Sequence, residues 1–278
     1  MRPLLLATRF NVAVKFAAPM PKITRNHTAP HPDQSTMANA PPLFAKPIHQ
    51  GNYEECGMIV EDTMQSCFRK SPYDWQMDAC RHLLRMQIQD SGLLPSVVLL
   101  VAPTGGGKSL VRDVVAAASP GVTLSVSPLL ALGADQESNL NLGIYDDCGP
   151  VAAFHVDEIL NDENKREEVI KKCLASDFDN GMSIILFASP QAISENEFWR
   201  KAIWGIIQKD KLNLVCVDEV HLFCSFGMFR SEFYALKEAL FDKILASDDA
   251  IDDPSKEPSS GTVLKCPLLA MVESTVRD

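Results

Sequence analysis

The sequence predicts an α/β fold in which a mainly parallel β-sheet carries helices on both faces, and three observations lead to this class. From residue 51 onward, short apolar runs alternate with helical patterns, as expected of a parallel sheet with crossover helices. The apolar runs show little alternation of polar and apolar residues, which is typical of strands buried on both faces. The 278 residues, 46% hydrophobic and 22% charged, suffice for a large core without disulfides or metals.

Six segments are expected to form strands, because each is short and most are rich in Val, Ile or Leu. They are Val97–Ala102, Val122–Val126, Val151–Phe154, Ser183–Ala188, Leu212–Val217 and Pro267–Val272. The expected helices are Tyr73–Gln87, Lys108–Ala118, Leu129–Leu140, Asp157–Ala175, Glu195–Ile207 and Ser231–Leu245. The acidic, proline-broken segment Ser247–Gly261 is expected to be a surface loop.

Residues 1–50 are expected to be a disordered tail, because they hold eight of the 18 prolines and no glycine. No acidic residue precedes Asp33, whereas five basic residues do: Arg2, Arg9, Lys15, Lys22 and Arg25. An acid-free, basic and amphipathic start is also the pattern of an organellar transit peptide. A plain basic tail and a mitochondrial or plastid address are therefore both open interpretations.

The charge balance and the cysteines exclude several other classes of protein. With 26 basic and 36 acidic residues the net charge is -10, so the chain does not coat nucleic acid through bulk charge, although a local basic groove stays possible. The eight cysteines form no C-x-x-C pair, which argues against a zinc site and favours buried, reduced thiols. No apolar run reaches the roughly 18 residues that a membrane span needs.

A phosphate-binding loop follows the first expected strand after residue 51, where residues 97–110 read VVLLVAPTGGGKSL. This is the Walker A pattern, with Ala102 at the position of its first glycine. Glycines let consecutive N–H groups turn toward one anion, and the following helix adds its positive dipole end. The ammonium of Lys108 is expected to reach the β- and γ-phosphates, and the Ser109 hydroxyl to ligate Mg²⁺. The nucleotide-binding candidates are Thr104, Gly105, Gly106, Gly107, Lys108 and Ser109.

A second site of chemistry follows the strand at residues 212–217, in the run LNLVCVDEVH. A buried strand here delivers Asp218 and Glu219 to its carboxyl end, where ligands bind in open α/β sheets. Asp218 is expected to hold Mg²⁺ through water, Glu219 to polarise the attacking water, and His221 to couple the site to neighbouring elements. The alternative for Asp218 is a helix N-cap.

These motifs resemble those of the RecQ-like DNA helicases of superfamily 2, and the resemblance covers roughly Pro72 to the C-terminus. A-P-T-G-G-G-K-S is similar to their motif I, and D-E-V-H at 218–221 to their DEAH-type motif II. S-P-L-L-A-L-G-A-D-Q at 127–136 resembles motif Ia, and A-S-P-Q at 188–191 resembles motif Ib. The resemblance implies that Ser127, Pro128 and Ser189 contact the backbone of single-stranded DNA.

Two further segments extend the resemblance on either side of these motifs. P-Y-D-W-Q at 72–76 resembles motif 0, which implies that Gln76 reads adenine, although Tyr73 stands where the family commonly has Arg. The run after motif II resembles the family's aromatic-rich loop, which implies that Phe226 and Phe229 stack on bases and Arg230 takes a phosphate. The structural alternative is that these two phenylalanines pack against the sheet edge.

The resemblance implies a RecA-like ATP-binding lobe over residues 51–278, with ATP and Mg²⁺ as cofactors and single-stranded or partly duplex DNA as partner. It also implies 3′-to-5′ movement, a role in DNA repair or recombination, and a nuclear address. The approach to motif III at 266–271 matches, but no counterpart of a second RecA-like domain follows, so we expect that this chain alone does not unwind DNA. The alternatives are an ATP-binding remnant acting as a nucleotide-dependent DNA or protein adaptor, and another P-loop NTPase such as a small-molecule kinase. Oligomeric state is open.

Overall fold

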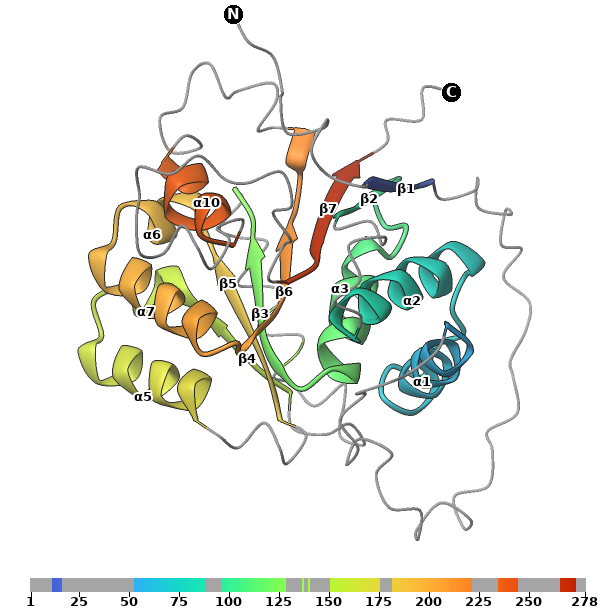
Figure 1. Cartoon of the computed structure of the whole chain (residues 1–278), viewed down its shortest axis with the longest axis horizontal. Helices are drawn as coiled ribbons and strands as arrows, with labels where there is room; N and C mark the ends of the chain where they lie inside the picture. The colour runs from blue at the N-terminus through green and yellow to red at the C-terminus, as the bar shows by residue number, and fades with distance from the viewer. Residues whose placement is uncertain are drawn as a thin grey trace, which may run out of the picture.

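The computed structural model describes residues 12–16, 53–88, 97–128, 137, 140, 151–175, 182–221, 235–244 and 266–273. Over these residues the chain forms a seven-stranded sheet in the order β1-β2-β7-β6-β3-β5-β4 (Figure 1). Every paired neighbour in the sheet is parallel. The predicted α/β class with a mainly parallel sheet is therefore confirmed.

The strands lie close to where the sequence predicted them. They are β1 (Val12–Phe16), β2 (Val97–Ala102), β3 (Gly121–Val126), β4 (Val151–His155), β5 (Ser183–Ala188), β6 (Leu212–Val217) and β7 (Leu268–Glu273). The bounds of β2, β5 and β6 match the prediction, those of β3 and β4 differ by one residue at one end, and β7 is shifted by one residue at both ends. Uninterrupted apolar runs in these segments leave few other places for a buried strand to begin or end.

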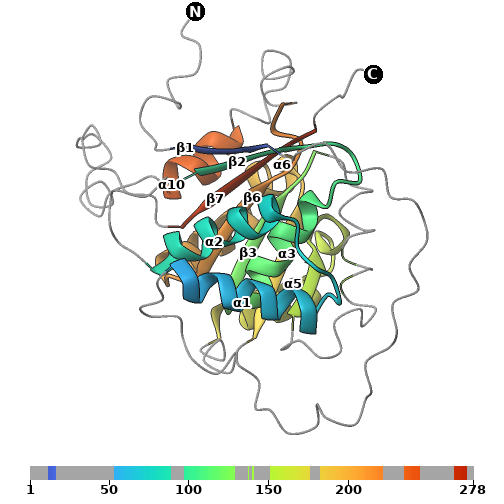
Figure 2. The same cartoon turned by 90° about the vertical axis from the view of Figure 1, so that its right-hand side faces the viewer.

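The strand β1 departs from the expectation that residues 1–50 form a tail without regular structure. Its five residues pair in parallel with β2, from Val12 opposite Val97 to Phe16 opposite Val101. Figure 2 shows β1 running alongside β2 at the border of the sheet. Without this pairing β2 would expose an unpaired row of N–H and C=O groups, so the sheet stabilises a segment whose flanking prolines predict no structure. The rest of residues 1–50 lies outside the described residues.

The helices match the prediction less closely than the strands do. They are α1 (Tyr53–Ser66), α2 (Asp74–Ile88), α3 (Lys108–Ala118), the 3₁₀ turn η2 (Val156–Ile159), α5 (Glu163–Leu174), α6 (Pro190–Ser194), α7 (Glu197–Gln208), the π-helical turn η4 (Lys237–Phe241) and α10 (Asp242–Ile244). The helices α1 and α6 were not predicted. The predicted helices at 129–140 and 231–245 and the loop at 247–261 lie wholly or partly outside the described residues.

Short polar residues explain where two of these helices begin. The carboxylate of Asp162 accepts the backbone N–H of Lys165 at 3.0 Å and starts α5, which separates that helix from η2. The amide oxygen of Asn196 accepts the backbone N–H of Trp199 at 3.1 Å and starts α7. Such caps satisfy otherwise unpaired helical N–H groups. The first divides the predicted helix Asp157–Ala175, and the second places the start of the predicted helix Glu195–Ile207 at Glu197.

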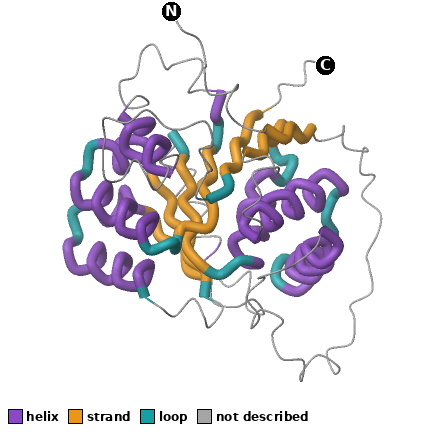
Figure 3. The backbone as a smooth tube through the Cα atoms, viewed as in Figure 1, coloured by secondary structure: helices purple, strands orange, loops and turns teal. Residues whose placement is uncertain are grey.

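Helices cover both faces of the sheet, with α1, α2 and α3 on one side and α5, α6, α7 and α10 on the other (Figures 1 and 3). The first face packs the helical side chains against the sheet around Val60, Leu83 and Val114. The second face is centred on Trp199 and Ile203, which pack against β3 and β5. No helix in the described ranges is both long and apolar enough to cross a membrane.

Most of the described cysteines are buried thiols, as the sequence predicted: Cys56, Cys80, Cys173, Cys216 and Cys266. Burial raises the pKa of Cys80, and it raises those of Cys173, Cys216 and Cys266 to about 12, so these groups stay protonated near neutral pH. Cys67 is the exception, because it is disulfide-bonded. The expectation of reduced thiols is therefore wrong at this residue.

Candidate nucleotide-binding site

The phosphate loop lies between the carboxyl end of β2 and the start of α3. Gly105 and Gly107 have φ angles of +70° and +85°, in the left-handed region that side chains with a Cβ rarely adopt. A Cβ at Gly107 would also lie 2.6 Å from Nε2 of Gln76. The Gly106 amide donates to the carbonyl of Pro103 at 3.0 Å, which closes the turn. The loop geometry therefore requires glycine at two of the three predicted positions for conformational reasons.

The donors of this loop suit an anion. Lys108 begins α3, and Gly107 before it makes no side-chain cap, so the first N–H groups of this helix have no capping side chain. The Lys108 ammonium donates to the carbonyls of Ala102 at 3.0 Å and Pro103 at 3.3 Å, which folds it back over the loop. Thr104 and Gly105 are exposed. A phosphate reaching the loop from solvent would thus meet a cation and several backbone donors.

The predicted acidic pair follows β6 at the same edge of the sheet. Asp218 is 5% exposed, its N–H donates to the carbonyl of Val126 at 2.9 Å, and its Oδ1 accepts the N–H of Glu219 at 2.9 Å. The carboxylate thus bonds the next residue in the chain, whereas an N-cap bonds the second or third N–H of a helix. Buried carboxylate oxygens at a strand end are suitable ligands for Mg²⁺.

Glu219 is held in an unusual backbone conformation. Its φ angle is +50°, in a region that costs a residue with a Cβ of order 1–3 kcal/mol. Its Oε2 lies 3.2 Å from Nδ1 of His221, and the side chain of Glu219 is 14% exposed while that of His221 is 42% exposed. A strained, mostly buried carboxylate next to a partly exposed imidazole is the arrangement expected of a group that acts on a reactant.

Sheet order brings the two loops to one edge. The strands β2 and β6 both pair with β7, so the phosphate loop and the Asp218 turn are separated by a single strand. Because all three strands are parallel, their carboxyl ends meet at the same edge, where ligands bind in open α/β sheets. Lys108 and Ser109 from the first loop and Asp218 and Glu219 from the second therefore border one site.

Gln76 lies next to this site, and its hydrogen bonds to the protein were not predicted from the sequence. Its side chain is 2% exposed, its Nε2 donates to the Gly107 carbonyl at 3.1 Å, and its Oε1 accepts the Tyr73 N–H at 2.9 Å. Both functions of the amide thus bond the protein, one of them on the phosphate loop. Trp75 stacks on Tyr73 with ring centroids 6.3 Å apart and also packs against the core. Adenine reading by Gln76 stays a prediction.

Three of the residues predicted to touch nucleic acid follow β3 and β5, and the two serines among them are buried. The N–H of Ser127 donates to the Ala188 carbonyl at 3.1 Å, which joins the two strand ends. The Ser189 N–H and hydroxyl donate to the Asp157 carboxylate at 2.8 and 2.5 Å, and its Oγ accepts the Ala192 N–H at 3.0 Å. Asp157 was missed by the sequence analysis, although an acid just after a strand is a usable signal. Pro128 is half-buried beside Ser127, whereas Phe226, Phe229 and Arg230 lie outside the described residues.

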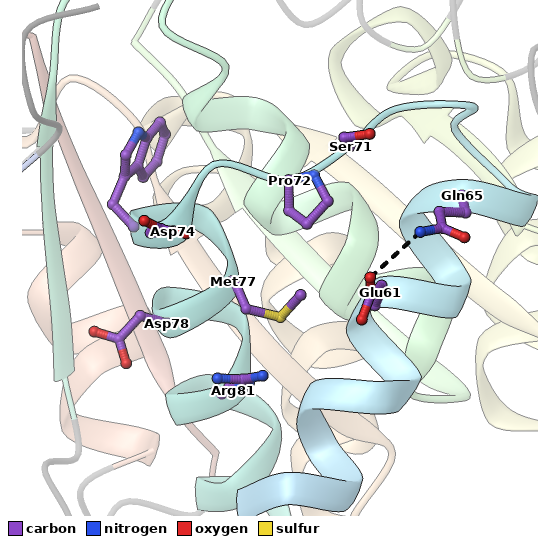
Figure 4. Close-up of a pocket in the computed structure, with 9 residues that line it drawn as sticks. Glu61, Gln65, Ser71, Pro72, Asp74, Met77, Asp78 and Arg81 are labelled. Carbon is purple, nitrogen blue, oxygen red and sulfur yellow. Dashed lines mark hydrogen bonds between the residues drawn. The ribbon is translucent and has the colours of Figure 1, made fainter.

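A separate groove of about 680 Å³ lies between α1 and α2 (Figure 4). Its lining includes the carboxylates of Glu61, Asp74 and Asp78 together with the guanidinium of Arg81. Gln76 faces the phosphate loop from the same helix α2 but does not line this groove. An excess of carboxylates repels phosphate, so the groove is not part of the phosphate site.

A parallel sheet, a phosphate loop between a strand and a helix, and an acidic pair on a nearby strand together define the RecA-like class of P-loop domain. The chain is similar over this lobe to the RecQ-like DNA helicases. It is 27% identical over 190 residues to the ATP-dependent DNA helicase Q1 of Rattus norvegicus, covering 63% of this chain and 28% of that protein. It is 27% identical over 144 residues to the ATP-dependent DNA helicase RecQ of Bacillus subtilis, covering 52% of this chain and 22% of that protein.

The match is thus partial, since the chain spans about a quarter of the length of these relatives. Among solved structures, one described as the DUF1998 helicase MrfA superposes with a TM-score of 0.47 at 16% identity, covering 78% of this chain and 29% of that one. No protein-family model matches the chain. The resemblance to RecQ-like helicases predicted from the motifs is confirmed by the sequence relatives.

Proposed function

We propose that this chain is the ATP-binding and DNA-binding motor lobe of a RecQ-like, ATP-dependent 3′-to-5′ DNA helicase. The observation that carries the proposal is the meeting of the phosphate loop and the Asp218–Glu219 turn at one edge of the sheet, in a chain similar to DNA helicases. The nucleotide lobe extends over residues 51–278. By family resemblance, the proposed setting is DNA repair or recombination in the nucleus.

Each nucleotide-site residue has a proposed role that its position supports. Lys108 exchanges its two carbonyl partners for phosphate oxygens, while the N–H groups of the loop bind the same anion. Ser109 and Asp218 hold Mg²⁺, which supplies charge neutralisation on the phosphates when bound. Glu219 takes a proton from the attacking water, and His221 at 3.2 Å orients its carboxylate.

The proposed adenine contact requires an exchange of hydrogen bonds. Gln76 has one donor and one acceptor committed to Gly107 and Tyr73, and adenine offers a matching acceptor and donor. Reading the base would release the Gly107 carbonyl, which belongs to the phosphate loop itself. Base selection and loop conformation are thereby linked through one side chain.

The proposed DNA partner is single-stranded or partly duplex, bound along the strand ends that carry Ser127, Pro128 and Ser189. Since the Ser189 hydroxyl is already bonded to Asp157, a phosphate there would meet backbone groups of the segment, with the serine holding them in place. Phe226 and Phe229 would add base stacking and Arg230 a phosphate contact. Because the chain has a net charge of -10, such DNA binding depends on a local basic surface and not on the overall charge.

The test measures binding of Mg·ATP and of a single-stranded oligonucleotide to the full chain, and then ATP hydrolysis with and without DNA. Lys108→Ala is expected to weaken ATP binding about 10- to 100-fold, the value of a charge-assisted hydrogen bond. Lys171→Ala, a matched change on the exposed surface of α5, should leave both affinities unchanged. Unchanged ATP affinity in Lys108→Ala would remove the phosphate-loop assignment. ATP and DNA binding by the wild type without DNA-stimulated hydrolysis would favour the adaptor alternative.

A further inference from the structure

Arg112 is a buried cation in the middle of the phosphate-loop helix, and no motif of the nucleotide site includes it. It lies in α3, one turn after Lys108, and is 1% exposed. Arginine is almost never fully buried unless its charge is paired, because desolvation of a charge is costly. Its position between the nucleotide loop and the sheet therefore calls for a physical reason.

The guanidinium joins its own helix to two strands. Its Nε and Nη2 donate to Oδ1 of Asp113 at 2.8 and 2.6 Å, and its Nη1 donates to Oγ of Ser125 on β3 at 3.2 Å. Its Cζ lies 4.7 Å from the centre of the Phe187 ring on β5. The planar fork of arginine allows these contacts at once, since the hydrogen bonds lie in its plane and the ring stacks on its face.

These contacts lie just before the carboxyl ends of the strands, where the nucleotide site lies. Ser125 is in register with Cys216 on β6 and with Phe187 on β5, so these side chains share one face of the sheet. Two residues further along the chain from Ser125, Cys216 and Phe187, just after the ends of these strands, come Ser127, Asp218 and Ser189. The guanidinium therefore contacts β3 and β5 two residues before the motif Ia and Ib serines, next to the strand β6 that leads to Asp218.

The charge of Arg112 is maintained by its surroundings. Burial alone would lower the pKa of Arg112, but the carboxylate of Asp113, assisted by Asp218, raises it. A buried ion pair of this kind adds little net stability, because replacing both members by apolar residues is often neutral or stabilising. Stability therefore does not explain why an arginine occupies this place, whereas a link between elements does.

We propose that Arg112 is a positioning residue that couples nucleotide binding at the phosphate loop to the strand ends that bind DNA. Phosphate binding acts on Lys108 and Ser109 at the start of α3, one turn from Arg112. A shift of that turn is transmitted through the guanidinium to Ser125 and Phe187, each two residues before a DNA-contact serine. This inference rests on the proposed function, since it needs both a nucleotide and a DNA site.

The coupling is a binding free energy and must be reciprocal, so it is measured from both sides. Affinity of the full chain for a fluorescent single-stranded oligonucleotide is measured with and without a non-hydrolysable Mg·ATP analogue, and affinity for the analogue with and without DNA. In the wild type we expect the analogue to change DNA affinity by about fivefold or more, the usual allosteric range. Arg112→Lys keeps the charge but loses the planar fork, so the change should fall below about twofold.

Two further variants separate positioning from folding. Arg166→Lys is the matched control: Arg166 also lies over a phenylalanine ring, 4.6 Å from that of Phe198, and donates to the Leu160 carbonyl at 2.8 Å, but it lies on the other face of the sheet. It should keep the wild-type coupling. The double variant Arg112→Met with Asp113→Leu removes the pair without leaving a buried charge, so it should match the wild type in thermal stability and still lose the coupling.

The outcomes are distinct. Coupling retained in Arg112→Lys or in the double variant would overturn the inference while leaving the proposed function intact. A wild type that binds nucleotide and DNA independently would also overturn it. A wild type that binds neither would contradict the proposed function, and the inference would fall with it. Loss of coupling in both Arg112 variants, with each single affinity within about twofold of the wild type, supports the positioning role.

Discussion

The phosphate loop and the ends of β5 and β6 lie at the same edge of one sheet, yet they are held by different chemistry. The loop is organised by main-chain atoms: two left-handed glycines, and carbonyls that accept from Lys108 and Gln76. The strand ends are organised by carboxylates, with Asp157 bonding Ser189 and Glu219 beside His221. The loop should therefore be sensitive to backbone angle at its glycines, whereas the strand ends depend on the charge of a few carboxylate atoms.

The largest expected effect tests the carboxylate side. Glu219→Gln keeps the size of the side chain but removes its basicity, so ATP turnover should fall about 10²- to 10⁴-fold, the usual contribution of a general base. Nucleotide affinity should change little, because this group acts on water. Single-turnover hydrolysis with labelled ATP measures the rate, and equilibrium binding serves as the control. Hydrolysis at the wild-type rate would exclude Glu219 from that role.

The next effect tests the main-chain side. Gly107→Ala puts a Cβ at a φ of +85° and 2.6 Å from Nε2 of Gln76, which should cost about 2–3 kcal/mol in unfolding free energy or in ATP affinity. Gly205→Ala is the matched control, because it lies inside α7 with nothing within 4 Å of the added Cβ and should stabilise by about 0.5–1 kcal/mol. Thermal unfolding measures the change in unfolding free energy, and nucleotide titration measures the change in ATP affinity. If Gly107→Ala changes neither quantity, the left-handed backbone angle at this position is not required.

A smaller effect is expected where a carboxylate holds a serine. Ser189→Ala removes a helix cap and a hydrogen bond to Asp157, so the free energy of unfolding should fall by about 2 kcal/mol. Ser194→Ala, in the same helix α6, removes a hydroxyl that is buried without a hydrogen-bond partner in the described structure, and should be neutral or stabilising. Urea denaturation compares the two. If Ser189→Ala and Ser194→Ala lower the free energy of unfolding equally, the cap at Ser189 does not contribute to the stability of α6.

The smallest effect concerns Gln76, whose side chain is predicted to read adenine and also bonds the phosphate loop. Gln76→Ala should weaken ATP binding about fivefold, close to 1 kcal/mol, and GTP binding less, if the amide exchanges Gly107 for adenine. Competition between the two nucleotides for the full chain measures this ratio. An equal loss for both would restrict Gln76 to supporting the loop.

The strands and the two loops were predictable from sequence because each depends on residues close together in the chain. The apolar runs of β2, β5 and β6 are uninterrupted, and the Walker A glycines, lysine and serine are contiguous. Prediction failed where distant segments decide the outcome. The strand β1 forms because β2 offers an unpaired edge. The helix α1, which packs on α2 and α3, was missed although Cys56, Val60 and Met64 recur at helical spacing.

The sequence by itself determined the class of fold, the order of the motifs and the chemical identity of the nucleotide-site residues, since periodicity and contiguous motifs are local properties. Only the tertiary structure decided which of those residues are neighbours. It brought the phosphate loop and Asp218 to strands on either side of β7, engaged both ends of the Gln76 amide and buried Ser189 against Asp157. It also placed Arg112 beneath them, because the register between parallel strands is set by packing across the whole sheet.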